Sequence, residues 1–135
     1  MTERPPRILL VDDEQSIQTL LSYPLRKEGY EVVQASDGRE ALERFGETTF
    51  DLVILDVVLA EGDGYELVRA LGADPQTADL DLIVYSADDV AAHDRPRLTL
   101  GRTQFVTKAG VDLAGVEERV LQLLQTDSTR PKDGT

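Results

Sequence analysis

The sequence contains no cysteine and only one histidine among its 135 residues. Without cysteine the chain can form no disulfide, no thiolate zinc site and no thiol nucleophile. This composition fits a reducing compartment, and we expect the protein to be cytoplasmic. The single histidine, His93, lies in the polar stretch AAHDRPR, where a solvated side chain is expected.

Long apolar runs and positive charge are also scarce. The N-terminal apolar run, ILLV, is far shorter than the core of a signal peptide, and no stretch approaches the ~20 apolar residues that span a bilayer. We therefore expect neither export nor a membrane anchor. Acidic residues outnumber basic ones 26 to 14, and the net charge is −12. That charge disfavours direct binding to nucleic acid or to anionic lipid.

Aliphatic residues are abundant and fall into two alternating kinds of segment. Short continuous apolar runs predict strands buried on both faces, at residues 8–11, 32–35, 52–55, 82–85 and 105–106. Apolar residues at helical spacing predict helices between them, around residues 17–25, 41–45, 67–71 and 116–124, with a short or irregular helix at 91–100. This alternation indicates an α/β protein with a parallel sheet covered on both faces.

Capping residues mark the ends of the first helices. Gly29 follows the first helix where a C-terminal cap is expected, and Asp37 with Glu40 has the spacing of a capping box at the start of the second. Pro24 removes one backbone donor from the first helix, so we expect a kink or a local loosening there.

The length of the chain suits one domain with a sizeable core rather than two domains. Its last ten residues, TDSTRPKDGT, are polar and contain proline and glycine. Chain ends of this composition are commonly frayed ends or linkers. We therefore predict one domain at residues 1–125 and a flexible tail or linker stub at 126–135.

Polar side chains stand at the ends of the predicted strands. Asp12 and Asp13 end the first strand, Asp56 the third and Ser86 the fourth, and Lys108 follows the fifth. Loops at the carboxyl ends of parallel strands form the ligand crevice of such a sheet. If the first and third strands are neighbours, three carboxylates converge, and two like charges ~4 Å apart repel by about 4 kcal/mol at an effective dielectric of about 20. A bound dication would relieve that repulsion.

Oxygen ligands without histidine or cysteine indicate a hard cation, and a few carboxylates with water and phosphate favour Mg²⁺ over Ca²⁺. Beside such an ion an aspartate can attack a phosphoryl group and form an acyl phosphate. Lys108 can supply positive charge to the phosphoryl oxygens, and Ser86 a hydrogen bond. Each residue alone also has an ordinary explanation: acids on a solvated turn, a strand-end hydroxyl, a surface lysine. Their combination favours the phosphoryl site.

Four segments resemble, in order and spacing, the receiver domain of bacterial two-component response regulators: ILLVDDE, DLVILDVVLAEGDGYELV, LIVYSA and FVTKAG. The resemblance covers about residues 7–125 and would make 1–125 a receiver domain. It implies a flavodoxin-like, doubly wound sheet of five strands in the order 2-1-3-4-5. It also implies a phosphorelay signalling protein. Such a protein is not an enzyme acting on other substrates, and it catalyses only its own phosphorylation and dephosphorylation.

Matched position by position, the resemblance implies a role for each acid. Asp56 is the implied phospho-acceptor. Asp13, Asp56 and the backbone carbonyl of Val58 are the implied Mg²⁺ ligands, and Asp12 would act through the water shell of the metal. The implied phosphodonor is a sensor histidine kinase or a histidine phosphotransfer protein.

The resemblance further implies a switch. Ser86 and Lys108 would hold the phosphoryl group, and Phe105 matches an aromatic residue that changes rotamer when the serine moves. Phosphorylation would then alter the surface made by the predicted fourth helix, fifth strand and fifth helix, at residues 91–100, 105–106 and 116–124. The downstream partner is unknown, and a homodimer is left open.

Two departures from the family pattern keep alternatives open. Ala109 and Ala60 each stand where the family commonly has proline. A cis peptide before alanine costs ~2.5–4 kcal/mol, so the loop at Ala109 is either strained or differently shaped. One alternative is therefore a receiver-like interaction module that is not phosphorylated. The other is a Mg²⁺-dependent phosphatase with an aspartyl nucleophile, for which Val58 occupies the place where a second acid would be needed.

Overall fold

The computed structural model describes residues 5–56, 63–86, 95–107 and 113–129. Within these ranges, five strands alternate with helices. The strands are β1 (Arg7–Val11), β2 (Glu31–Ala35), β3 (Leu52–Asp56), β4 (Asp81–Ser86) and β5 (Thr103–Thr107). The helices are α1 (Gln15–Lys27), α2 (Gly38–Glu47), α3 (Asp63–Ala73) and α4 (Leu113–Thr129), with the 3-10 helix η2 (Arg95–Leu98).

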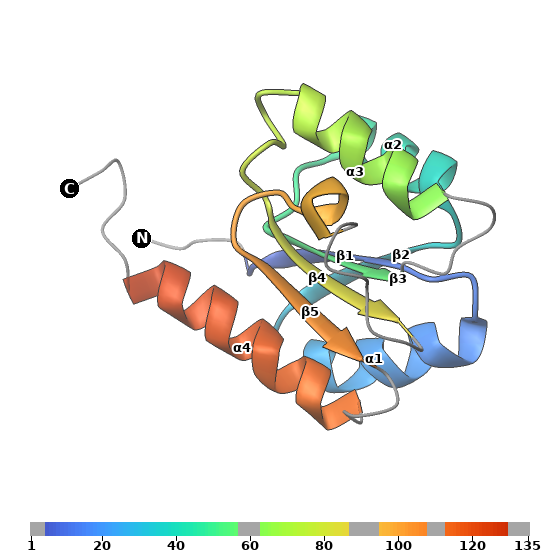
Figure 1. Ribbon diagram of the computed structural model, residues 1–135. Helices are drawn as coiled ribbons and strands as arrows, with labels where there is room; N and C mark the ends of the chain where they lie inside the picture. Colours follow the sequence, from blue (N-terminus) through green and yellow to red (C-terminus); the bar gives the residue numbers. More distant parts are fainter. Residues whose placement is uncertain (1–4, 57–62, 87–94, 108–112, 130–135) are drawn as a thin grey trace.

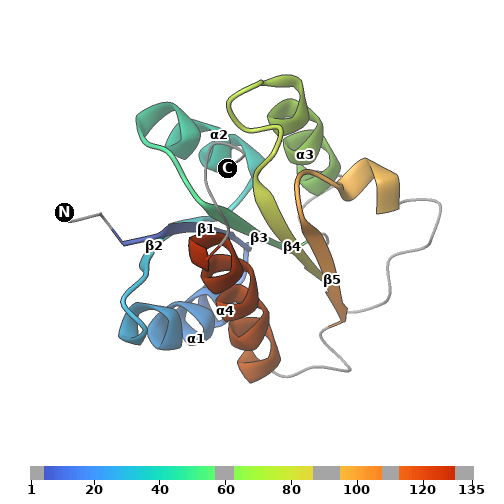
Figure 2. The same ribbon diagram turned by 90° about the vertical axis from the view of Figure 1, so that its left-hand side faces the viewer.

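The five strands form one parallel sheet in the order β2-β1-β3-β4-β5 (Figure 1), which confirms the expected order. Helices α1 and α4 cover one face of the sheet, and α2 and α3 cover the other (Figure 2). The structure is thus a three-layered α/β fold, and the carboxyl ends of all five strands lie at one edge of the sheet.

Alternate residues of β3 enter two separate cores. Leu52 and Ile54 belong to the core beneath α1 and α4, whereas Val53 and Leu55 belong to the core beneath α2 and α3. All four side chains are fully buried. A parallel sheet covered on both faces has no solvent-facing side, and this explains why the strands are continuous apolar runs in the sequence.

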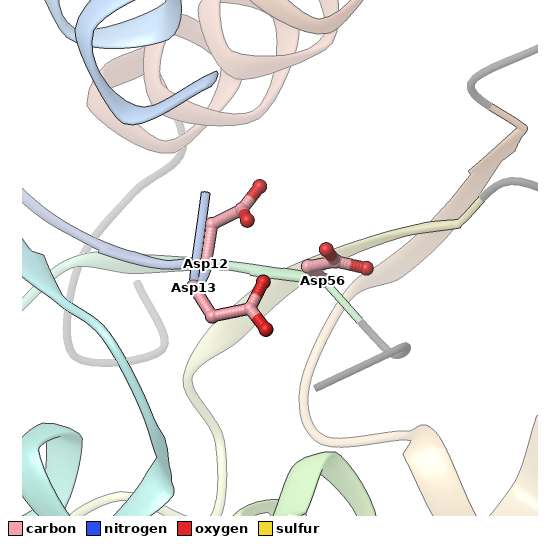
Figure 3. A group of neighbouring side chains, drawn as sticks. All are labelled: Asp12, Asp13 and Asp56. Atoms are coloured by element: carbon pink, nitrogen blue, oxygen red, sulfur yellow. The ribbon is translucent and has the colours of Figure 1, made fainter. Parts of the chain in front are cut away.

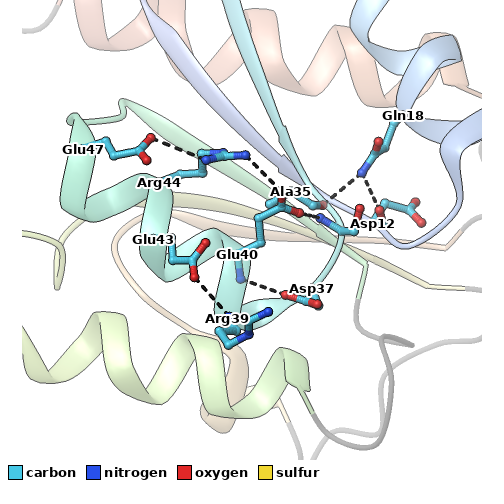
Figure 4. Close-up of polar contacts among 10 residues, drawn as sticks. Asp12, Gln18, Ala35, Asp37, Arg39, Glu40, Glu43, Arg44 and Glu47 are labelled. Carbon is cyan, nitrogen blue, oxygen red and sulfur yellow. Dashed lines mark hydrogen bonds and ion pairs between the residues drawn. The ribbon is translucent and has the colours of Figure 1, made fainter.

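The predicted capping residues lie at the start of α2 and just after the end of α1. Asp37 caps α2, because its Oδ1 accepts a hydrogen bond of 2.8 Å from the backbone N–H of Glu40 (Figure 4). The Glu40 carboxylate in turn accepts from the backbone N–H of Ser36 at 2.6 Å. Gly29 follows α1 with a φ of +98°, a conformation that favours glycine. Pro24 lies inside α1, and the helix continues past it.

Replacing Asp37 with alanine should lower the free energy of unfolding by about 1 kcal/mol, because the Glu40 amide at the helix start loses its acceptor. Urea unfolding followed by circular dichroism would measure the change. Asp37→Asn is the matched control, since asparagine also caps helices and should keep most of the stability. An equal loss in both variants would show that the cap does not act through this hydrogen bond.

The C-terminal half adds two details to the expected architecture. Where the sequence predicts a short or irregular helix at 91–100, the described residues contain the four-residue 3-10 helix η2. Helix α4 continues to Thr129, past the predicted domain end at 125, and the division into domain and tail stays a prediction. In the part of the chain that the structure describes, no helix combines the length and apolar character needed to cross a membrane.

Candidate functional site

The candidate site lies at the carboxyl ends of β1 and β3, which are neighbours in the sheet. Val11, the last residue of β1, pairs with Leu55 of β3. The next residues, Asp12 just after β1 and Asp56 at the end of β3, therefore lie side by side, and Asp13 follows Asp12 along the chain. The prediction of an acidic cluster required β1 and β3 to be neighbours, and the structure confirms that they are.

Asp12, Asp13 and Asp56 lie next to one another at the strand ends (Figure 3). One carboxylate oxygen from each residue lies within 4.8 Å of the others. Asp12 is 0% and Asp56 3% exposed, whereas Asp13 is exposed to solvent. Three acids at this spacing offer oxygen ligands of the kind that a hard dication prefers, with solvent access on the side of Asp13.

Hydrogen bonds fix both the carboxylate and the backbone of Asp12. Its Oδ1 accepts from the backbone N–H of Glu14 at 2.8 Å, and its Oδ2 accepts from the hydroxyl of Tyr85. The Asp12 backbone N–H donates to the carbonyl of Ala35 at 3.0 Å. The Gln18 side-chain amide donates to the carbonyls of Asp12 and Ala35, at 2.5 and 3.0 Å (Figure 4). Asp12 is thus held in place from β2, α1 and β4.

Tyr85 reaches Asp12 from β4. It pairs with Asp56 in the register of β3 and β4, and it is 1% exposed. Burial, the hydrogen bond to Asp12 and the negative charges of Asp12, Asp56 and Glu14 raise the pKa of Tyr85 well above its ordinary value. The hydroxyl therefore keeps its proton at neutral pH and acts as a donor to Asp12.

The sequence alone does not identify Tyr85 and Gln18 as neighbours of the acidic cluster. Tyr85 stands in an apolar run that predicts a buried strand, and Gln18 lies on a predicted amphipathic helix. One signal was available, because a buried tyrosine hydroxyl usually finds a hydrogen-bond partner. Identifying Asp12 as that partner requires the order and register of the strands.

The other predicted site residues are described only in part. Ser86 ends β4 as expected, but the position of its side chain is outside what the structure describes. Phe105 lies in β5, partly buried, and packs against the core beneath α2 and α3. Its switching role stays a prediction. Outside the described residues lie Val58, Ala60, His93, Lys108 and Ala109, so what is expected of them also stays a prediction.

Comparison with known proteins agrees with this geometry. The family model for the response regulator receiver domain matches residues 8–120. The alkaline phosphatase synthesis transcriptional regulatory protein PhoP of Bacillus subtilis is 40% identical over 102 residues, which cover 76% of this chain and 42% of PhoP. The CAI-1 autoinducer sensor kinase/phosphatase CqsS of Vibrio cholerae is 35% identical over 103 residues, which cover 76% of this chain and 15% of CqsS. The chain thus spans less than half the length of either relative.

A solved structure matches over a larger share of its own length. The response regulator TrrA from Thermotoga maritima, in complex with Mg²⁺-BeF, has a TM-score of 0.70 and 32% sequence identity to this chain. The match covers 87% of this chain and 98% of the TrrA chain. The similarity therefore extends over most of the fold.

Proposed function

The chain belongs to the response regulator receiver family, and we propose that Asp56 accepts a phosphoryl group from a phosphohistidine donor while Mg²⁺ is bound. Receiver domains are signalling switches rather than conventional enzymes. The observation that carries the proposal is the meeting of Asp12, Asp13 and Asp56, with one oxygen from each within 4.8 Å of the others.

The proposed Mg²⁺ site uses the acids of two neighbouring strands. Asp13 and Asp56 would bind the ion directly, together with the carbonyl of Val58, and Asp12 would contact it through water. The oxygen ligands fit a hard dication, and TrrA is a relative solved with Mg²⁺-BeF. Bound Mg²⁺ would compensate the negative charge that gathers on the carboxylates and on the phosphoryl oxygens.

In the proposed reaction Asp56 is the nucleophile. A carboxylate oxygen of Asp56 forms a bond to phosphorus while the bond from phosphorus to the donor imidazole nitrogen breaks, which leaves an acyl phosphate on the chain. Every residue of β3 is buried, so the nucleophile stands at the end of a rigid strand. Rigid placement matters because phosphoryl transfer depends mainly on alignment and charge stabilisation.

The proposed output is a change in a nearby surface. The acyl phosphate carries a charge of about −2 in place of the single negative charge of the free carboxylate, and Ser86 and Lys108 would be drawn toward its oxygens. That movement would alter the surface made by η2, β5 and α4, which is where we propose that a downstream protein binds. The proposed phosphodonor is a sensor histidine kinase or a histidine phosphotransfer protein. We propose that the chain acts in the cytoplasm. The transcriptional role in the name of PhoP belongs to that longer protein.

Acetyl phosphate with Mg²⁺ should add one phosphoryl group to the chain, detected by intact-protein mass spectrometry. Hydroxylamine should remove the group, because it cleaves acyl phosphates. Mg²⁺ with beryllofluoride should shift the NMR resonances of residues around Asp13 and Asp56. If acetyl phosphate gives no label and beryllofluoride gives no resonance shift, the alternative of an interaction module that is not phosphorylated would be favoured. Rapid turnover of an external phosphate ester would favour the phosphatase.

Mg²⁺ should also raise the melting temperature of the protein. An ion that binds only the folded state stabilises it by about 2.7 kcal/mol at one hundred times its Kd. Calorimetry in Mg²⁺ and in a chelator would measure the shift, with NaCl of equal ionic strength as the control. Asp13→Asn should reduce the shift because one carboxylate ligand is lost. An equal shift in NaCl would contradict specific binding at the acidic cluster.

A further inference from the structure

Tyr85 connects the acidic cluster to the core beneath α1 and α4. The side chain belongs to that core together with Leu10 and Ile54. Its hydroxyl donates a hydrogen bond to Oδ2 of Asp12, and its backbone pairs with Asp56 in the sheet. The side chain of Tyr85 is thus anchored in the core and contacts the carboxylate of Asp12. Its strand, β4, lies beside the strand that ends in Asp56.

The carboxylate of Asp12 needs contacts of this kind to hold one orientation. The terminal torsion of an aspartate side chain is broad, so the backbone alone does not fix the carboxylate plane. The backbone N–H of Glu14 fixes Oδ1 at 2.8 Å, and the hydroxyl of Tyr85 fixes Oδ2. A carboxylate has about four lone-pair directions, so these two hydrogen bonds do not by themselves use all of its accepting capacity.

We propose that Tyr85 is a positioning residue for Mg²⁺ binding, because its hydroxyl holds the Asp12 carboxylate in the orientation that serves the ion. This inference rests on the proposed function, since it presupposes a Mg²⁺ site at Asp12, Asp13 and Asp56. Tyr85 acts through Asp12. Partners that orient the residues around a metal typically change metal affinity by about 10–100-fold when they are removed.

The test is to measure the Mg²⁺ affinity of the wild-type protein and of the Tyr85→Phe variant by isothermal titration calorimetry. Phenylalanine keeps the ring that packs in the core and removes only the hydroxyl. We expect the Kd for Mg²⁺ to rise about tenfold. Tyr30→Phe is the matched control: Tyr30 packs against the same core but stands before β2, at the opposite edge of the sheet. That variant should leave the Kd unchanged.

A double-mutant cycle separates positioning from a general loss of packing. In an Asp12→Asn background, Tyr85→Phe should change the Kd by less than about twofold, because the carboxylate that the hydroxyl orients is already gone. An equal weakening in both backgrounds would show that the hydroxyl does not act through Asp12, and it would overturn the inference.

The wild-type protein provides a second test, which does not require any variant to fold. The hydroxyl proton of Tyr85 should be protected from exchange, and its NMR resonance should move when Mg²⁺ is added. A resonance that stays in place at saturating Mg²⁺ would overturn the inference. Normal uptake of Mg²⁺ by both the unchanged chain and Tyr85→Phe would overturn this inference alone. No uptake by the unchanged chain would overturn the proposed metal site together with it.

Discussion

Asp56→Ala should carry no phosphoryl label after incubation with acetyl phosphate and Mg²⁺, whereas the unchanged chain should be labelled on Asp56. Neighbouring Asp12 should not take over, because its carboxylate is buried and is held in a fixed orientation by Glu14 and Tyr85. Intact-protein mass spectrometry would measure the loss of label, and peptide mapping would locate the label on the unchanged chain.

The matched control is Asp79→Ala, which removes an acid of the same kind from the other end of the sheet. Asp79 is exposed and precedes β4, whereas the acidic cluster lies at the carboxyl ends of β1 and β3. This variant should be labelled as fully as the unchanged chain. Full labelling of Asp56→Ala would exclude Asp56 as the phospho-acceptor.

Gly101→Ala should lower the free energy of unfolding by about 3 kcal/mol. A Cβ atom at Gly101 would clash with the backbone carbonyl of Asp79 and would lie 2.9 Å from the carbonyl oxygen of Leu80. Both neighbours are backbone groups, so no change of rotamer can relieve the clash. The backbone N–H of Gly101 also donates to Leu80 at 2.8 Å, just before β4 and β5 begin to pair. Denaturant unfolding would measure the loss.

Gly46→Ala is the matched control for this close approach. Gly46 is exposed in α2, and a Cβ atom there would have no neighbour within 4 Å. Alanine is favoured over glycine within a helix, so this variant should gain about 0.5–1 kcal/mol. If the two variants changed stability equally, the close packing around Gly101 would not be the cause.

The strands could be predicted from the sequence because each is a compact apolar run, as in the fully buried β3. Their order could not be read from such runs, since all five are similarly apolar and the order depends on contacts between distant parts of the chain. The order came from the family resemblance, and the structure confirms it. The Asp12, Asp13 and Asp56 cluster followed, because acids at the carboxyl ends of neighbouring parallel strands must meet.

Two features were harder to predict, for different reasons. The direction in which the Tyr85 hydroxyl points depends on which strands flank β4 and on their register, and no local pattern contains that information. The end of α4 at Thr129 did have a local signal, because helices usually end at or before the residue that precedes a proline, and Pro131 stands two positions after Thr129. The polar composition of the last residues obscured that signal.

The strand order also affects how the chain can fold during synthesis. With β1 made first, β2 adds to one side of it and β3 to the other, and β4 and β5 then follow outward from β3. Every new strand therefore meets an exposed edge, and none has to be inserted between two strands that have already paired. A nascent chain that has emerged only as far as β3 already holds three adjoining strands, on which the later ones can assemble in the order in which they leave the ribosome.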